Sequence, residues 1–314
     1  MGGVDQTMGR CSLQIWTSGG LLGAYAATLA FVLLASSAPA VTRFSLTHAL
    51  GVLDLVMLRC SIGGLLFLPF LVARWKRLPR NLAVVGLALA FLHGWGMHLT
   101  AIAGLQFAPA GHAAALGPGF VPVWVMLWRR LWYGKWPGGL QSAGLASITL
   151  GAVVLVGYSA ASGFEGRMVV GDLFFLLSSC LASAYLVYVQ RHAVDPIQGA
   201  ALVAVYSGIA GLLLLAWPAP SAIWTAPTSE LLVQAAFQGV GMGACAILFA
   251  TYATLHLGSQ RFAVFVAAIP VLSLLLGRII VGDGIHLFEA AAVVLVSAGI
   301  LLAGFFAAEA QHPA

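Results

Sequence analysis

Long apolar segments alternate with short clusters of glycine, proline, charged and amide residues along the whole chain. Each apolar segment is about 20 residues long, which is the length an α-helix needs to cross the hydrocarbon core of a bilayer. The pattern therefore predicts an all-α polytopic membrane protein with ten transmembrane helices and short connections. The predicted spans are 19–41, 52–73, 81–103, 108–130, 139–158, 170–189, 197–217, 231–253, 260–282 and 285–307.

The ten segments divide into two halves in which proline, arginine and glycine residues recur at matching positions. Pro122 and Pro270, each deep in an apolar segment, are 148 residues apart. The same offset relates Arg130 to Arg278, Gly134 to Gly282, and Gly151 to Gly299. Five spans per half make the second half an inverted copy of the first, an organisation typical of transporters. We expect a tail at 1–18, a first repeat at 19–158, a loop at 159–169, a second repeat at 170–307 and a tail at 308–314.

Composition excludes a water-soluble protein. Apolar residues make up 61% of the chain and charged residues only 7%, whereas soluble domains carry about 25% charged residues. The mean hydropathy is +1.00. Four scattered cysteines offer neither a disulfide framework nor a CxxC pair. We expect no cofactor and no metal site.

Lysine and arginine placement predicts the orientation of the spans. The connections and tails on the same side as the N-terminus hold ten basic residues. The connections on the opposite side hold only Arg43, Arg167 and Arg278. Basic residues concentrate in cytoplasmic loops, so we expect a multi-pass protein of the cell (inner) membrane with both termini in the cytoplasm. Residues 21–40 resemble a cleavable signal peptide, but cleavage would break the five-plus-five match. The ten basic residues are Arg10, Arg74, Lys76, Arg77, Arg80, Arg129, Arg130, Lys135, Arg191 and Arg261.

The order and spacing of several short motifs resemble a known family. Residues 105–112 (LQFAPAGH) lead to Pro122 and Gly134, and residues 255–260 (LHLGSQ) lead to Pro270 and Gly282. With Gly171-Asp172-Leu173 after the first half, this arrangement is similar to that of EamA-type transporters of the drug/metabolite transporter superfamily. The family's acidic residue after the repeat glycine is present as Asp283, whereas the first repeat has Lys135 there. The resemblance implies a ten-helix carrier with inverted five-helix repeats that moves small organic metabolites.

The prolines predict local breaks in the fourth and ninth spans. A proline inside a helix removes a backbone donor and displaces the carbonyl four residues earlier, which would free the carbonyls of Pro118 and Val266. Free carbonyls at membrane depth must face protein, water or a ligand. Glycine resists helical ordering and weakens the fourth span further. We expect helix breaks or gating elements at Gly117, Pro118, Gly119, Pro122 and Pro270.

Polar and aromatic side chains at membrane depth are few, and such residues are candidates for function. We expect a central substrate cavity lined by His93, Trp95, His98, His112, Trp124 and Gln238. Interhelical hydrogen bonding by the same residues is the structural alternative. Arg59 is a structural or gate charge that either snorkels outward or pairs with Asp54. Asp283 and Glu289 are interpreted as solvated helix-end charges.

These features favour a carrier for a small amphipathic or amino acid-like metabolite that works by alternating access. Export and import both remain open, as do proton coupling and facilitated diffusion. The expected partners are a small-molecule substrate and the lipid bilayer, with no nucleic acid, and a homodimer is left open. The alternative is an intramembrane enzyme that acts on a lipid or small molecule. No HExxH motif and no nucleophile elbow supports an enzyme.

Overall fold

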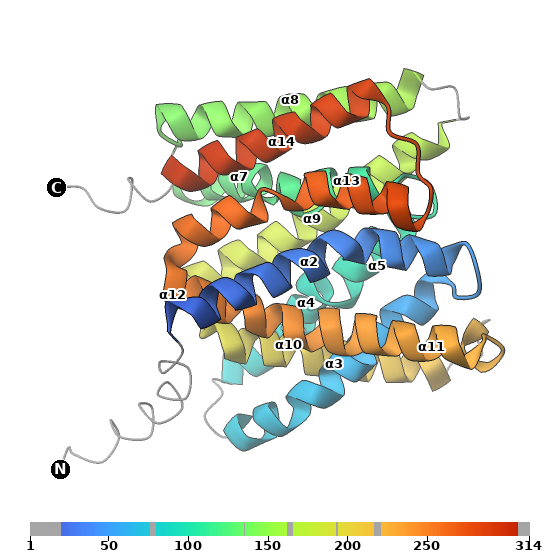
Figure 1. Cartoon of the computed structure of the whole chain (residues 1–314). Coiled ribbons are helices and arrows are strands. Elements are labelled where there is room, and N and C mark those ends of the chain that lie inside the picture. The colour runs from blue at the N-terminus through green and yellow to red at the C-terminus, as the bar shows by residue number, and fades with distance from the viewer. Residues whose placement is uncertain are drawn as a thin grey trace, which may run out of the picture.

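A computed structural model describes residues 20–75, 80–134, 136–161, 166–192, 194–216 and 221–306. The predicted tails at 1–18 and 308–314 lie outside these residues, as do Lys76, Arg77 and Lys135. Ten helical spans within the described ranges are long and apolar enough to cross a membrane. The expected ten-helix, all-α architecture is thereby confirmed. The start of α2 and the end of α14 lie at the same end of the bundle (Figure 1).

Several of the ten spans consist of more than one helical element. The third is split at Gly94 between two helices, the fourth at Gly117, and the eighth contains a π-helical stretch. Gly258, with φ 80° and ψ 156°, separates the eighth span from the ninth inside the element labelled α12. The elements are α2 (Leu21–Leu46), α3 (Val52–Arg74), α4 (Arg80–His93), α5 (Trp95–Gly104), α6 (Ala110–Leu116), η2 (Pro118–Phe120), α7 (Val121–Tyr133), α8 (Gly139–Ala161), α9 (Arg167–Arg191), α10 (Pro196–Ala216), η3 (Ala222–Trp224), α11 (Thr228–Gln234), η4 (Ala235–Cys245), α12 (Ala246–Val266), α13 (Ile269–Ile280) and α14 (Leu287–Phe306).

Pro122 and Pro270 occupy equivalent places at the start of a helix. Each lies in the first turn, Pro122 in α7 and Pro270 in α13. A proline there removes no intrahelical hydrogen bond, because the first N–H groups of a helix have no partner within it. The prolines therefore restart the fourth and ninth spans after a break. Neither proline kinks a continuous helix, which agrees with the breaks expected from the sequence.

Helices α8 and α14, the last spans of the two halves, pack closely along their glycines (Figure 1). A Cβ atom built on Gly144 would lie 2.5 Å from the backbone nitrogen of Ala303, and one on Gly299 would lie 2.7 Å from the carbonyl oxygen of Gly144. Small residues permit this close approach of two backbones within a membrane. Ser147 Oγ donates to the carbonyl oxygen of Leu295 at 2.8 Å, and these two residues are 148 positions apart. Contact between equivalent residues places this helix pair on the axis relating the repeats.

Replacing Gly144 with valine is expected to destabilise the fold by roughly 1–3 kcal/mol, the usual cost of overpacking. The new side chain would collide with the backbone of α14. Gly157→Val is the matched control, because Gly157 lies on the same helix and a Cβ atom there would meet nothing within 4 Å. Unfolding titrations with sodium dodecyl sulfate in mixed micelles measure the difference. Equal stability of the two variants would contradict the proposed helix contact.

Candidate functional site

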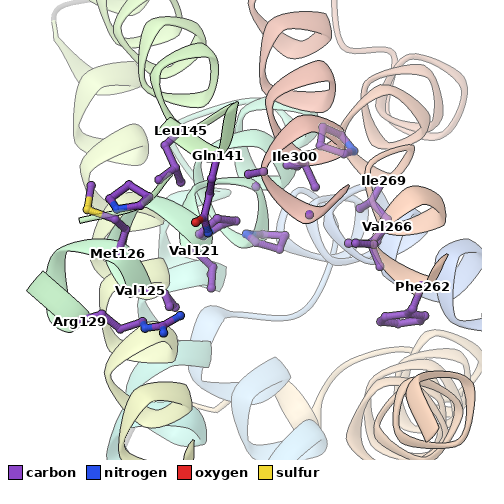
Figure 2. Close-up of a pocket in the computed structure, with 18 of the residues that line it drawn as sticks. Val121, Val125, Met126, Arg129, Gln141, Leu145, Phe262, Val266, Ile269 and Ile300 are labelled. Atoms are coloured by element: carbon purple, nitrogen blue, oxygen red, sulfur yellow. The ribbon is translucent and has the colours of Figure 1, made fainter. Parts of the chain in front are cut away.

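A cavity of about 560 Å³ lies where the breaks in the fourth and ninth spans approach each other. Four of the predicted break residues line it: Pro118, Gly119, Pro122 and Pro270. Gly117 forms the break itself, with φ −76° and ψ −106°, but does not line the cavity. Figure 2 shows side chains from both halves of the chain around the same space. The volume falls in the range typical of small-molecule sites.

The cavity is built from equivalent residues of the two repeats. Four pairs of lining residues are each separated by 148 positions, the same offset that relates the two prolines. A cavity lined in this way straddles the axis between the inverted repeats, which is where inverted-repeat transporters place their sites. The pairs are Ala114 with Phe262, Pro118 with Val266, Val121 with Ile269, and Pro122 with Pro270.

Beyond these pairs the two repeats differ. Val125, Met126 and Arg129 of α7 line the cavity, and Trp136 next to them is 70% exposed. We call the end of the bundle that holds Arg129 and Trp136 the cavity end. The counterparts of the three α7 residues, 148 positions later in α13, do not line the cavity but are buried. They are Ser273, Leu274 and Gly277.

Packing of α13 against α6 closes the other end, which we call the closed end. Ser273 Oγ donates to the carbonyl oxygen of Ala110 at 3.1 Å. A Cβ atom on Gly277 would lie 3.0 Å from the Cβ of Ala110, and one on Gly111 would lie 2.7 Å from Leu274 Cδ1. The face of α7 therefore lines the open cavity end, whereas the equivalent face of α13 packs against α6 and seals the closed end.

An ion pair fastens the closed end. Arg43 Nε lies 3.2 Å from Asp283 Oδ1, and Arg43 also donates to the carbonyl oxygens of Leu105 and Ala108. The other oxygen of Asp283 accepts from the backbone N–H of Ala110 at 3.1 Å. Asp283 thus ties α2, the start of α6 and its own loop together. Its role is structural at this end, and its side chain is only 9% exposed.

The carbonyl groups at the two breaks differ from each other. The carbonyl oxygen of Pro118 accepts from the backbone N–H of Val121, so the expected free carbonyl is absent there. Across the second break, Ala267 donates to Ala263 and Ala268 to Phe265. No hydrogen bond from the described residues reaches the carbonyl of Val266, which agrees with the expectation for Pro270.

Arg59 lies in a buried polar network that joins the halves. Its Nε donates to Oε1 of Gln238 at 2.9 Å, Nη2 donates to the same oxygen, and Nη1 lies 3.3 Å from Nδ1 of His98. Gln238 Nε2 donates to Oγ1 of Thr42 at 2.8 Å and to Oε1 of Gln234 at 3.1 Å. No carboxylate of the described ranges pairs with this arginine. Its side chain is 9% exposed.

Both alternatives considered for Arg59 from the sequence are therefore wrong: it neither snorkels outward nor pairs with Asp54. Asp54 instead accepts from Ser221 Oγ at 2.7 Å and from the backbone N–H groups of Gly51 and Ala222. The carboxylate is thereby satisfied at the start of α3. It also anchors the loop before η3.

His112 belongs to a second buried network, which includes two carboxyl groups. Its Nδ1 lies 2.8 Å from Asp172 Oδ1, and its Nε2 lies 3.6 Å from Glu289 Oε1. Ser159 Oγ donates to the other oxygen of Asp172 at 2.5 Å. All four residues are at most 2% exposed. The interpretation of Glu289 as a solvated helix-end charge is therefore wrong, because α6 packs against α14 and covers it.

The other predicted cavity residues make contacts elsewhere. The His93 ring stacks on Tyr185 with centroids 4.4 Å apart, Trp95 packs edge-on against Phe91, and Trp124 Nε1 donates to Ser179 Oγ at 3.1 Å. None of the six predicted cavity residues lines the cavity between the breaks. They are His93, Trp95, His98, His112, Trp124 and Gln238.

Comparisons with known proteins agree with this architecture. The model of the EamA-like transporter family matches residues 21–157 and 169–305, once for each repeat. A protein of known crystal structure has the same fold, with a TM-score of 0.60 and 24% identity over 89% of this chain and 96% of its own. A search among curated proteins finds no match. With both of its repeats matched, this chain belongs to the EamA-like transporter family.

Proposed function

We propose that this membrane carrier moves a small organic metabolite through the cavity between the breaks by alternating access. One observation carries the proposal: equivalent residues of the inverted repeats line a cavity that is open at one end and sealed at the other. An inverted repeat can exchange the conformations of its two halves at little cost in free energy. That exchange would close the open end and open the sealed one.

The exchange predicts a specific contact in the alternate state. In the alternate state, α7 should pack at the cavity end as α13 now packs at the closed end. Val125 would then contact Gly258, because their counterparts Ser273 and Ala110 are in contact now. Gly258 has a positive φ angle, and a Cβ atom there would meet nothing within 4 Å. Space for the incoming helix therefore exists at this position.

We propose that the cavity end faces the cytoplasm of a cell membrane. At this end the helices α3, α7 and α9 end with, or close to, the arginines Arg74, Arg129, Arg130 and Arg191. Basic residues concentrate on the cytoplasmic side. In this conformation the carrier would take up or release its substrate inside the cell. The direction of net flux would then follow from the gradients across the membrane.

Filling the cavity is expected to stop transport. The protein is reconstituted into vesicles loaded with a panel of amino acids, organic acids, nucleosides and sugars, and efflux is compared with that of protein-free vesicles. Val266→Trp, which places an indole in the cavity, should reduce efflux at least tenfold. Val264→Trp is the matched control, because Val264 is 42% exposed two residues away and does not line the cavity.

Two results would contradict the proposal. One is efflux through Val266→Trp at the rate of the control variant. The other is recovery of a chemically altered compound in place of the loaded one, which would identify an enzyme.

A further inference from the structure

We infer that the cavity selects amphipathic anions, with the acidic head group held by Arg129 and the apolar body held between α7 and α13. This inference rests on the proposed function in that it assigns a substrate class to the same cavity. Its support comes from the charges, hydrogen-bond donors and apolar surfaces that line the space. Its test measures binding without transport.

Charge is distributed unevenly in the lining. Arg129 is the one charged side chain among the residues described around the cavity, and no aspartate or glutamate lines it. Gln141 adds an amide and Trp136 an indole ring to the lining. Such a lining attracts a negative head group and disfavours a cation. Low-dielectric walls strengthen both effects, because they screen charge less than water does.

Arg129 is available for a ligand, whereas its neighbour is not. In the described part of the chain, Arg129 makes no ion pair and no hydrogen bond, and its guanidinium points into the cavity (Figure 2). The guanidinium of Arg130 lies over the Trp136 ring, 5.1 Å from its centroid, and does not line the cavity. Arg191 at the same end lies over Trp132 and Tyr133. A planar guanidinium without a partner is well suited to bind a carboxylate or phosphate with two hydrogen bonds.

The rest of the cavity accepts an apolar body. Val121 and Val125 of the fourth span face Phe262, Val266 and Ile269 of the ninth across the space (Figure 2). Pro122 and Pro270 add further apolar surface. A ligand with a charged head at Arg129 would bury a hydrocarbon or aromatic body against these side chains. Burying each CH₂ group strengthens binding severalfold, since it contributes about 0.8 kcal/mol.

A matched series of three compounds tests the head group directly. The probes 3-phenylpropionate, 3-phenylpropionamide and 3-phenylpropylammonium share one body and differ in the charge of the head. Their dissociation constants are measured by equilibrium dialysis with the purified full-length protein in detergent micelles. We expect the carboxylate to bind roughly tenfold more tightly than the amide, the lower end for a charge-assisted hydrogen bond, because Arg129 is exposed at the cavity end. The ammonium compound should bind most weakly.

Variants of two adjacent arginines supply the control. Arg129→Gln should reduce carboxylate binding to the level of the amide, while Arg129→Lys should keep most of the preference. Arg130→Gln changes the protein's charge equally but should leave all three dissociation constants unchanged. Thermal unfolding of each variant shows whether it is folded.

Two outcomes would overturn the inference. The first is wild-type protein that binds the three compounds equally or prefers the ammonium. The second is an equal loss of carboxylate binding in Arg129→Gln and Arg130→Gln, which would indicate a general surface potential. Because these measurements need no flux, failure of the transport proposal would appear separately, as selective binding without efflux.

Discussion

A disulfide between the variants Ala110→Cys and Gly277→Cys is expected to abolish transport, and reduction is expected to restore it. A Cβ atom on Gly277 would lie 3.0 Å from the Cβ of Ala110, so moving the two helices apart by about 0.5–0.8 Å gives the Cβ–Cβ distance of a disulfide. The bond would hold α6 against α13 and keep the closed end sealed. Vesicle efflux before and after addition of a reducing agent measures the effect. The native cysteines Cys11, Cys60, Cys180 and Cys245 are first replaced by serine or alanine.

Two controls accompany this experiment. Each single-cysteine variant should transport at the same rate with and without oxidant. The cross-linked protein should still bind 3-phenylpropionate, because the cavity end stays open when the closed end is locked. Undiminished efflux from fully cross-linked protein would show that α6 and α13 need not separate during transport.

Removing the oxygen that holds Arg59 is expected to destabilise the fold severely. Gln238 Oε1 is the one side-chain oxygen of the described chain that accepts from this guanidinium. Gln238→Leu would leave the buried charge without its oxygen acceptor and with only His98 Nδ1 beside it, and breaking a buried charge interaction costs about 3–5 kcal/mol. Changing both residues, with Arg59→Met and Gln238→Leu, should recover most of the stability, because no charge then remains to be solvated. Detergent unfolding titrations measure the free energy of unfolding for each variant.

Gln190→Leu is the matched control for this prediction. Gln190 is exposed near the end of α9, so losing its amide should change stability by less than about 0.5 kcal/mol. A Gln238→Leu protein as stable as Gln190→Leu would contradict the account of the network. So would a double variant no more stable than Gln238→Leu alone.

The number of spans and the two repeats could be predicted from sequence because both depend on local or periodic features. Segment length and apolarity define a membrane span without knowledge of its neighbours. The offset between Pro122 and Pro270 then relates the halves directly. Glycine spacing also reflects packing, since Gly151 and Gly299 are 148 positions apart and both lie in the contact of α8 with α14.

The cavity could be predicted only in part. The prolines indicated where the two repeats meet, and both line the cavity. Most of the remaining wall consists of apolar side chains such as Val121 and Phe262, which sequence alone cannot distinguish from lipid-facing residues. Arg129 was interpreted only as an orientation signal. Its direction into the cavity depends on how α7 packs.

Burial of polar residues was the least predictable feature. Glu289 lies in the first turn of α14 and Asp172 in the second turn of α9, and positions near a helix end suggest access to solvent. In the folded chain both face His112 from helices that are distant in sequence. The partner of Arg59 is 179 residues away. Such pairings follow from the three-dimensional arrangement of helices and leave no short-range pattern in the sequence.

Cross-linking at the cavity end during turnover tests alternation between the two repeats most directly. Val125→Cys and Gly258→Cys stand 148 residues from Ser273 and Ala110, whose side chain and carbonyl oxygen are 3.1 Å apart at the closed end. In vesicles with substrate on both sides, we expect this pair to form a disulfide and transport to stop as it forms. Sustained efflux with no disulfide at this pair would contradict the exchange of conformations between the repeats.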